Sequence, residues 1–475
     1  MNPIKKTKIV ATLGPSCDDQ TIIEKMILAG VNVFRINFSH ANYEEVEDRI
    51  RRIREADKKL NTQTAILADL QGPKLRVGKM EEGAVVKPGD QVIFSTKEPF
   101  VGNAKKAYMN YKQFPKDVTS GEKILLDDGK LIFEVVASDR KTEVTAKVLQ
   151  GGAFKSNKGV NLPNTNISLP ALTKKDIQDA EFIFTQDVDW IALSFVRHSE
   201  DVLMLKELMK KHLKVPIPII SKIEKPEAIE NIDKIIAYSE GLMVARGDLG
   251  VEVPVAEVPL LQKELVLLSK KARIPIIIAT QMMETMTDSL TPTRAEVNDV
   301  ANSVMDGADA VMLSGETSVG KYPVEVIETM RSIVMQVENS NRVVVPQDPP
   351  NIRTKRFITK SVCFHAAQIA NDINAQAICT LTNSGYTAYQ ISAWRPISNI
   401  LVFTSNKRIL TQLSLLWGVK AFYYDNFEST DNTVEEINAI AQEKGFVVEE
   451  DMVVNLTAMP ITRKGMVNTL RVSVI

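Results

Sequence analysis

The chain has 475 residues, more than one hydrophobic core usually serves, so two or three domains are expected. Its composition, 44% hydrophobic and 25% charged, is typical of a soluble globular protein. A net charge of −1 gives no general attraction for nucleic acid or anionic membranes, and no apolar run is long enough to span a bilayer. The amino terminus lacks an apolar signal core, and the three cysteines are too few and scattered for a disulfide framework or a zinc site, so the predicted location is the cytoplasm.

Apolar runs of strand length alternate with helical patterns from residue 1 to about residue 340. The runs are apolar throughout, which is typical of parallel strands buried on both faces. Amphipathic spacing predicts helices at 43–60, 199–213, 254–272 and 291–306. Eight strand–helix units are the count of a (β/α)8 TIM barrel. The predicted strands are 7–14, 31–38, 64–70, 189–195, 217–223, 241–247, 274–280 and 308–313.

Two further domains are expected, one inside the barrel sequence and one after it. After the third strand, short alternating runs with turn signals such as Asp127-Asp128-Gly129 predict an inserted all-β domain that could act as a lid over the barrel mouth. The proline-rich stretch 345–350 predicts a linker, and five apolar runs beyond it predict an α/β domain. The expected organisation is a catalytic barrel at 1–71 and 170–342, a β-barrel lid at 72–169 and a C-terminal α/β domain at 343–475.

Charged residues follow two neighbouring predicted strands. Lys222 and Glu224 share one strand face, and two charges beside a core cost free energy unless something binds them. The next strand ends in Arg246-Gly247-Asp248. Glu224 and Asp248, with substrate oxygens, predict a Mg²⁺ site, and Lys222 fits a point charge on a transferring phosphoryl group. The alternative is an ordinary ion pair between one of these carboxylates and Lys222 or Arg246.

Another strand end combines an arginine, an amide and a hydroxyl. Arg35, Asn37 and Ser39 alternate onto one face, which suits a cradle for phosphate or a cation. His40 beside them is as often a solvated or capping residue as a ligand.

Two hydroxyls stand at the ends of the seventh and eighth predicted strands. Thr280 and Ser314 could relay a proton, or they could equally cap helices. No histidine is near either residue in sequence, so a serine nucleophile has no support.

These stretches occur in a specific order and spacing, and together they resemble the pyruvate kinase family over nearly the whole chain. The resemblance implies transfer of the phosphoryl group of phosphoenolpyruvate to ADP, giving pyruvate and ATP, the last step of glycolysis. It also suggests that the protein is a phosphotransferase and forms a homotetramer. No nucleic-acid or membrane partner is expected. The matching stretches are 7–15, 35–40, 158–163, Ser221-Lys222-Ile223-Glu224, 243–250, Ala279-Thr280-Gln281-Met282 and 313–317.

The resemblance also implies a role for each site residue. Lys222 is the transition-state lysine, and Glu224 and Asp248 are ligands of Mg²⁺ or Mn²⁺. The substrate phosphate meets Arg35, and its carboxylate meets the backbone at Gly247 and Asp248 with the hydroxyl of Thr280. The enolate is protonated with help from Thr280 and Ser314. Nucleotide contacts fall on Asn37, Phe38, Ser39, His40, Arg76 and Lys158.

One departure from the family pattern concerns potassium. Many members bind this ion at the positions of Asn37, Ser39, Asp69 and the Leu70 carbonyl, and carry a glutamate nearby in a Gly-Pro-Glu run. Here the run is Gly72-Pro73-Lys74, and Leu70 replaces a common threonine. An ammonium group can supply the charge that potassium supplies elsewhere, so we expect little or no need for a monovalent cation. The alternative is that Lys74 points to solvent.

The sequence leaves two questions open: whether the C-terminal domain binds an effector, and whether the chain has a function other than phosphoryl transfer. The loop 380–387 has hydroxyls and a glycine that suit phosphate, but Tyr386 stands where regulated members often have arginine. An equally supported interpretation is that this loop caps a helix and binds no ligand. The alternative functions are a Mg²⁺-dependent barrel lyase acting on pyruvate enolates, which would lack the insertion and the last domain, and a catalytically silent effector sensor. The intact catalytic residues argue against the sensor.

Overall fold

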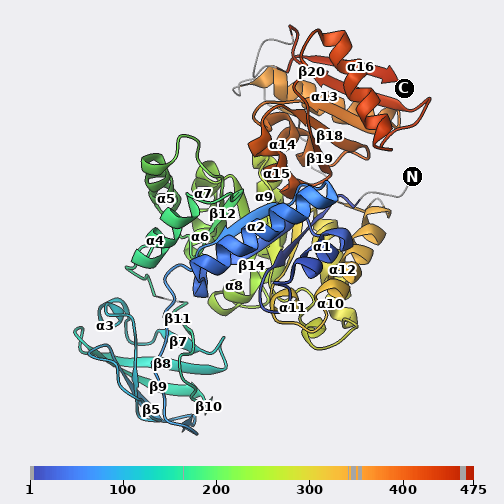
Figure 1. The fold of residues 1–475 in the computed structure, drawn as a ribbon. Helices are drawn as coiled ribbons and strands as arrows, with labels where there is room; N and C mark the ends of the chain where they lie inside the picture. The colour runs from blue at the N-terminus through green and yellow to red at the C-terminus, as the bar shows by residue number, and fades with distance from the viewer. Residues whose placement is uncertain (1–4, 164, 341, 344–348, 351–355, 461–466) are drawn as a thin grey trace.

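The structure is a computed structural model that describes residues 5–163, 165–340, 342–343, 349–350, 356–460 and 467–475. It has three parts in a row, with the barrel between the inserted domain and the C-terminal domain (Figure 1). Within the described residues, no helix combines the length and apolarity needed to cross a membrane.

The eight predicted strands form a closed parallel barrel, which confirms the predicted fold class. Each strand pairs in parallel with two neighbours, and the ring closes where Lys8 is in register with Ala310. Their near-continuous burial explains why the runs are apolar throughout. The strands are β1 (Lys8–Thr12), β2 (Val33–Asn37), β3 (Ala65–Asp69), β12 (Trp190–Leu193), β13 (Ile219–Ile223), β14 (Gly241–Ala245), β15 (Ile276–Ala279) and β16 (Ala310–Leu313).

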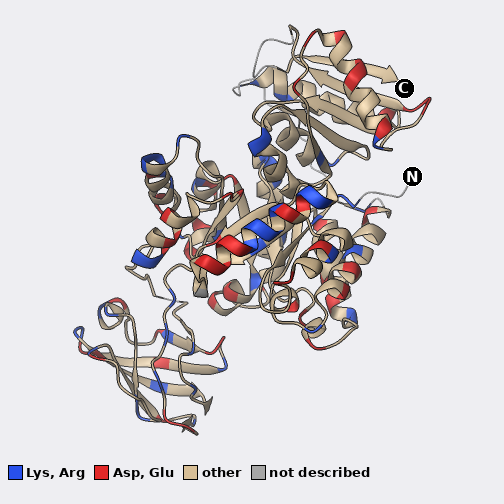
Figure 2. Ribbon diagram, in the orientation of Figure 1, with Lys and Arg blue, Asp and Glu red and all other residues tan. Residues whose placement is uncertain are grey.

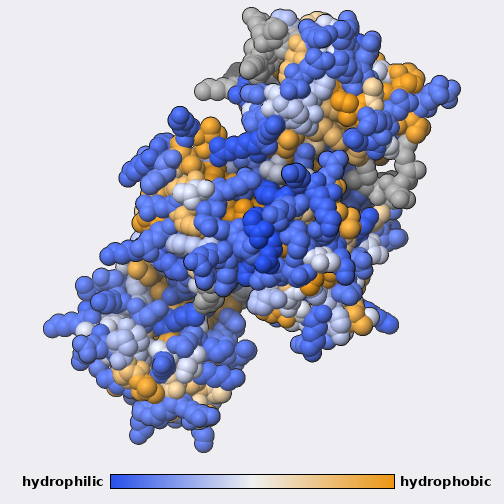
Figure 3. All heavy atoms as spheres, viewed as in Figure 1, coloured by the Kyte–Doolittle hydropathy of each residue, from blue (hydrophilic) through white to orange (hydrophobic). Residues whose placement is uncertain are grey.

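Amphipathic helices cover the barrel. In α2 (Tyr43–Leu60), the Asn42 side chain caps the first turn, and Val46, Ile50 and Ile53 are buried. The outer face of α2 is strongly charged and hydrophilic (Figures 2 and 3). The other barrel helices are α1 (Gln20–Ala29), α4 (Lys174–Ile183), α5 (Ser199–His212), α6 (Pro226–Glu230), α7 (Ile232–Tyr238), α8 (Arg246–Glu252), α9 (Val258–Ala272), α10 (Arg294–Asp306), α11 (Gly315–Ser318) and α12 (Pro323–Glu338), with 3-10 turns η1 (Phe38–His40) and η2 (Glu284–Thr287).

Within its described residues, the inserted domain is all-β apart from the short helix α3 (Phe114–Asp117). Its main sheet has the order β11-β7-β8-β9-β5-β6, and β4 pairs with β10 separately. Residues 75–81 bond to both edges, since the Val77 N–H donates to the Lys158 carbonyl (3.0 Å) and the Gly78 N–H to the Tyr108 carbonyl (2.8 Å). The sheet therefore closes around its own aromatic core. Its strands are β4 (Val85–Val86), β5 (Gln91–Ser95), β6 (Lys106–Tyr108), β7 (Lys123–Leu126), β8 (Leu131–Ser138), β9 (Glu143–Gln150), β10 (Gly152–Ala153) and β11 (Val160–Asn161).

The described residues of the C-terminal domain form a five-stranded sheet with helices, as predicted. Four strands are parallel, and β21 adds antiparallel to β20 at one edge. Most of the predicted linker 345–350 lies outside the described residues. The elements are α13 (Phe357–Asp372), β17 (Ala377–Leu381), α14 (Tyr386–Ala393), β18 (Asn399–Thr404), α15 (Lys407–Gln412), the 3-10 turn η3 (Leu413–Leu415), β19 (Val419–Tyr423), α16 (Thr430–Glu443), β20 (Met452–Thr457) and β21 (Thr469–Val474).

The two ends of the barrel face different domains. At the amino ends of the strands, Lys8 Nζ donates to the Val419 carbonyl (2.8 Å) and Trp190 Nε1 to the Gln412 carbonyl (3.1 Å) of the C-terminal domain. At the carboxyl ends, Asn161 of the inserted domain bonds to Glu252 of α8. The inserted domain therefore lies over the end of the barrel where such folds place their active sites.

Candidate active site

Four charged side chains meet at the carboxyl ends of β2, β3 and β13. Arg35 Nε lies 2.6 Å from Asp69 Oδ2. Lys222 Nζ lies 3.3 Å from Asp69 Oδ1 and 3.0 Å from Glu224 Oε1. The side chains of Asp69 and Glu224 are each 1% exposed, so these pairs are almost closed off from water. The structure thus brings Arg35 from one predicted strand end together with Lys222 and Glu224 from another, and Asp69 lies between the two cations.

Two hydroxyls orient the cations of this cluster. Lys222 Nζ donates to Ser194 Oγ (2.7 Å), and Ser194 Oγ donates to the Leu70 carbonyl (2.7 Å). Arg35 Nη1 donates to Thr12 Oγ1 (3.1 Å). Each cation is therefore held by a carboxylate and a hydroxyl, which fixes its position before any ligand arrives.

The buried charges shift one another's proton affinity. Burial disfavours the ammonium of Lys222, but Asp69 and Glu224 outweigh that effect and raise the pKa of Lys222 above its ordinary value. Burial disfavours the Asp69 carboxylate, but Lys222 and Arg35 outweigh it and lower the pKa of Asp69. The pKa of Glu224 is raised by burial and by the Asp248 charge, although Lys222 opposes both. Lys222 is thus kept charged, while Glu224 and Asp248 repel each other.

Glu224 and Asp248 fit a divalent cation as a shared site. Glu224 Oε2 accepts from the Phe195 N–H (2.7 Å), and the Asp248 side chain has no hydrogen-bond or ion-pair partner among the described residues. The alternative ion pair exists for Glu224 and Lys222, whereas Arg246 pairs with Asp299 (2.6 Å). In the described part of the chain, no three His, Cys, Asp or Glu residues gather as metal ligands. A bound cation would complete its shell with substrate oxygens and water, as Mg²⁺ commonly does.

Thr280 is held in a strained backbone conformation against Gly247. Its φ is 67°, which a β-branched residue rarely adopts, at a cost of about 1–3 kcal/mol. Thr280 Oγ1 accepts from the Gly247 N–H (2.7 Å) and donates to the Ala279 carbonyl (2.6 Å). Ser314 occupies the cap position of α11, without a side-chain capping bond. The Ser314 side chain therefore caps no helix, whereas the Thr280 hydroxyl accepts an N–H in the first turn of α8, as its capping alternative expects. The proton relay stays a prediction for both residues.

Lys74 lies in the segment that leads from β3 into the inserted domain, and its side chain extends to the expected potassium site. Although much of its side chain is exposed, Lys74 Nζ donates to Ser39 Oγ (3.1 Å). The Asn37 side chain accepts from the Ser39 N–H (3.0 Å). Burial lowers the pKa of Lys74, and so does Lys222, while Asp248 and Asp69 oppose the shift. The ammonium therefore contacts a residue of the expected ion site while Lys74 stays exposed, and replacement of potassium stays a prediction.

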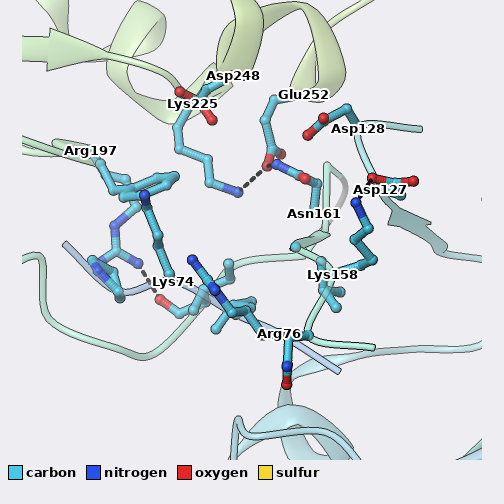
Figure 4. Close-up of a pocket in the computed structure, with 17 residues that line it drawn as sticks. Lys74, Arg76, Asp127, Asp128, Lys158, Asn161, Arg197, Lys225, Asp248 and Glu252 are labelled. Carbon is cyan, nitrogen blue, oxygen red and sulfur yellow. Dashed lines mark hydrogen bonds and ion pairs between the residues drawn. The ribbon is translucent and has the colours of Figure 1, made fainter. Parts of the chain in front are cut away.

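The predicted nucleotide residues are only partly brought together. Arg76 and Lys158 line a pocket of about 290 Å³ between the inserted domain and the barrel, together with Asp248 (Figure 4). Lys158 Nζ pairs with Asp127 (2.9 Å). Phe38 is buried with its ring near Phe182, so only its backbone is available to a ligand. The side chain of His40 lies outside the described residues.

Three residues at the mouth of the barrel were not predicted from the sequence: Lys225, Arg197 and Glu252. Lys225 directly follows Glu224, which was a weak indication of its place in the site. Nothing in the sequence pattern indicated Arg197 or Glu252. Arg197 donates to the carbonyls of Ile167 and Leu169 at the exit of the inserted domain. Lys225 Nζ lies 2.6 Å from Glu252 Oε1.

The predicted effector loop bonds mainly to itself. Thr380 Oγ1 donates to Thr387 Oγ1 (2.9 Å), and the Gly385 N–H donates to Thr382 Oγ1 (3.0 Å). Tyr386 stacks with the Arg356 guanidinium at 4.6 Å. Binding of a phosphorylated effector stays a prediction.

A closed parallel barrel whose strand ends gather buried cations and carboxylates under a second domain defines a (β/α)8-barrel enzyme for small anionic substrates. Residues 4–327 match the family model "Pyruvate kinase, barrel domain", and residues 360–473 match "Pyruvate kinase, alpha/beta domain". The chain therefore belongs to the pyruvate kinase family, and the predicted function of a pyruvate kinase is confirmed.

Individual relatives agree along the whole chain. The pyruvate kinase of Geobacillus stearothermophilus is 41% identical over 99% of this chain and 80% of its own length. That of Bacillus licheniformis is 41% identical over 99% and 81%. The crystal structure of a pyruvate kinase from Cryptosporidium parvum superposes with a TM-score of 0.90 at 32% identity, covering 99% of this chain and 96% of that one.

Proposed function

We propose that this enzyme is a phosphotransferase that moves the phosphoryl group of phosphoenolpyruvate to ADP, giving pyruvate and ATP. The observation that carries the proposal is the buried ammonium of Lys222, which lies between Asp69 and Glu224 at the barrel mouth. Phosphoryl transfer needs positioning and charge stabilisation more than covalent chemistry. A fixed cation in a nearly dry site meets that need, because its field is weakly screened there.

The neighbouring groups suit the two ends of phosphoenolpyruvate. Arg35 would bind the phosphate, and the substrate carboxylate would lie against the backbone of Gly247 and Asp248 with the hydroxyl of Thr280. Because the Gly247 N–H already donates to Thr280 Oγ1, a bound carboxylate would exchange one oxygen acceptor for another. Thr280 and Ser314 would help to deliver a proton to the enolate.

Glu224 and Asp248 would hold Mg²⁺ or Mn²⁺. The bound cation would neutralise phosphate charge during the transfer. Its electrostatic effect on this chain would be to relieve the repulsion between the two carboxylates that contributes to the raised pKa of Glu224.

The nucleotide would enter the pocket between the two domains. Arg76 and Lys158 present cations to its phosphates from the inserted domain (Figure 4). Asn37, Ser39, His40 and the backbone of Phe38 would complete the nucleotide site from the barrel. Asp127 would be displaced from Lys158 as the phosphates bind.

A coupled assay with phosphoenolpyruvate, ADP and Mg²⁺ tests the proposal. We expect ATP formation by the unmutated protein and a loss of at least about 10²–10³-fold in turnover for Lys222→Met. Lys210→Met, on the exposed side of α5, is the matched control and should leave turnover unchanged. Failure of the unmutated protein to form ATP would refute the kinase. Carbon–carbon cleavage without ADP would instead indicate the lyase, and effector binding without turnover the silent sensor.

We also propose that Lys74 replaces the monovalent cation. The bond from Lys74 Nζ to Ser39 Oγ supports this, because Ser39 is an expected ligand of that cation. Turnover should be the same in potassium-free tetramethylammonium buffer as in KCl. Lys74→Glu should create a dependence on KCl, and Lys214→Glu, at an exposed lysine that follows α5, serves as control. Collapse of the unmutated enzyme without potassium would disprove the replacement.

A homotetramer acting in the cytoplasm completes the proposal. Large apolar side chains are exposed on α9 (Leu260, Leu267) and on the edge strand β21 (Val472, Val474), which gives subunits surfaces to bury. The three cysteines are free and buried, which fits a reducing compartment. Sedimentation velocity should show a single species of four chains, and a monomer at micromolar concentration would disprove the tetramer.

A further inference from the structure

Glu252 is a buried carboxylate that joins the inserted domain to the barrel (Figure 4). Its side chain is 1% exposed. Its Oε1 accepts two bonds, from Lys225 Nζ at 2.6 Å and from Asn161 Nδ2 at 2.8 Å. Lys225 belongs to the barrel, whereas Asn161 is the last residue of strand β11 in the inserted domain.

The partners of Glu252 adjoin the two proposed metal ligands. Lys225 directly follows Glu224, and Glu252 ends the same helix, α8, whose first turn carries Asp248. The Lys225–Glu252 pair therefore ties the loop of Glu224 to the helix of Asp248. Asn161 adds the inserted domain to that tie, so three segments distant in sequence converge on one oxygen atom.

Nothing else among the described residues fixes the Glu252 carboxylate. Its Oε2 is buried without a hydrogen-bond partner there. A buried carboxylate is costly unless it is paired and hydrogen-bonded, so its geometry depends on the two donors at Oε1. If the inserted domain lifts, Asn161 leaves and the carboxylate keeps only Lys225.

We propose that Glu252 is a positioning residue that couples docking of the inserted domain to the placement of Glu224 and Asp248. With the domain docked, Asn161 and Lys225 together hold Glu252, and through it the two segments that carry the carboxylates. When the inserted domain is raised, Glu252 loses its bond from Asn161 and positions Glu224 and Asp248 less firmly. The enzyme therefore turns over slowly until the domain docks. The inference rests on the proposed phosphoryl transfer for its kinetic test, but the docking itself is measured without turnover.

Single and paired substitutions at the lid contact test the coupling kinetically. Asn161→Ala should lower kcat about tenfold, as expected for loss of one hydrogen bond to a charged acceptor, with KM for phosphoenolpyruvate changed less than about twofold. Asn161→Asp should lower kcat further, because two carboxylates then face each other. Combining Asn161→Asp with Glu252→Gln should recover most of the loss, since the amide and the carboxylate exchange places and Lys225 keeps a carboxylate partner. A general packing defect would not show this rescue.

Spin labels measure docking directly. The native cysteines are buried, so labels at Lys58→Cys on α2 and Lys141→Cys in the inserted domain would report the distance between the two domains. Asn161→Asp should lengthen that distance and the paired exchange should restore it. Asn157→Asp adds a carboxylate to the same pocket and should leave the distance unchanged.

Two results would overturn the coupling: unchanged kcat and distance in Asn161→Ala, or no recovery in the paired exchange. If the unmutated protein formed no ATP, the proposed function would fail, while the distances would still decide whether Glu252 controls docking.

Discussion

At the residue scale, Asp69 decides how the site holds its positive charge. It lies between Arg35 and Lys222, and its side chain is 1% exposed. Removing one partner from a buried network leaves the others without compensation, which commonly costs about 3–5 kcal/mol. The same carboxylate therefore serves the fold and the proposed chemistry.

Asp69→Asn preserves the shape of the side chain and removes its charge. We expect the free energy of unfolding to fall by about 3 kcal/mol, because Arg35 then loses its ion pair with Asp69 and Lys222 keeps only the ion pair with Glu224. Urea unfolding at pH 7 measures the change. Asp187→Asn breaks an ion pair to Arg54 with a carboxylate that is 74% exposed, and it should cost less than about 1 kcal/mol. Equal losses in the two variants would contradict the argument.

The stabilisation by Asp69 should also depend on pH. Its pKa is lowered in the folded protein, so the charged form is favoured by folding. The stabilisation is then complete above the unfolded pKa, about 3.9, and is lost as the pH falls through the lower folded value. The difference in unfolding free energy between the unmutated protein and Asp69→Asn should accordingly shrink below about pH 4. A difference that grows in acid would contradict this sign.

Lys74 should give potassium-free turnover its own alkaline limit. Burial and Lys222 lower its pKa below the ordinary lysine value of 10.5, so its charge is lost earlier as the pH rises. Without potassium, turnover should fall through this range, and KCl should restore it by supplying the missing charge. pH–rate profiles with and without KCl measure the difference. Superimposable alkaline limbs would show that the Lys74 charge is not the one that matters.

At the scale of elements, the sequence patterns predict strands and helices better than they predict contacts between them. The apolar runs locate all eight barrel strands because each strand is buried on both faces. The helix predicted at 254–272 begins only at Val258, since the segment from Pro254 forms a turn closed by the Glu257 N–H. Lys222 and Glu224 could be paired from strand periodicity.

Contacts that join distant elements could not be predicted in this way. The bond from Lys222 to Ser194 and the bond from Asn161 to Glu252 link residues 28 and 91 positions apart. Local periodicity says nothing of such pairs, because they depend on how the barrel closes and where the inserted domain lies. The resemblance implies the catalytic roles, and the geometry adds groups that hold those residues in position.

Arg197 anchors the exit of the inserted domain, and its substitution should loosen that segment. The guanidinium donates to the carbonyls of both Ile167 and Leu169, which a lysine cannot do in the same planar geometry. Arg197→Lys should speed proteolytic cleavage of the exit segment and lower kcat. Arg140→Lys breaks a comparable bond, to the Lys116 carbonyl (2.7 Å) inside the inserted domain, and should change neither. Unchanged cleavage in Arg197→Lys would remove the anchor role.

At the scale of the whole molecule, the two ends of the barrel divide the work. The carboxyl ends carry the charged site beneath the inserted domain, and the amino ends pack on the C-terminal domain. In barrels of this kind, residues at the amino ends mainly support stability. Damage at the joint with the C-terminal domain should therefore reach the fold before it reaches the chemistry.

Arg395 tests that division. It lies 3.0 Å from Asp309 of the barrel, donates to the Gly307 carbonyl (2.7 Å) and stacks on Trp417, with its side chain 1% exposed. Arg395→Met would leave Asp309 buried without its cation, so we expect a loss of about 3–5 kcal/mol. Because the joint then no longer links the two cores, calorimetry should show the single unfolding transition split in two.

Turnover below the first of these transitions should stay within about twofold of normal, since the site lies at the opposite end of the barrel. Arg408→Met, which removes only an exposed contact to the Pro216 carbonyl (3.4 Å), is the control and should keep one transition. One unshifted transition in Arg395→Met would mean that the apolar contacts alone join the domains. Loss of turnover in the still-folded variant would mean instead that changes at the amino ends of the strands alter the active site. The two ends of the barrel would then not have separate roles in stability and catalysis.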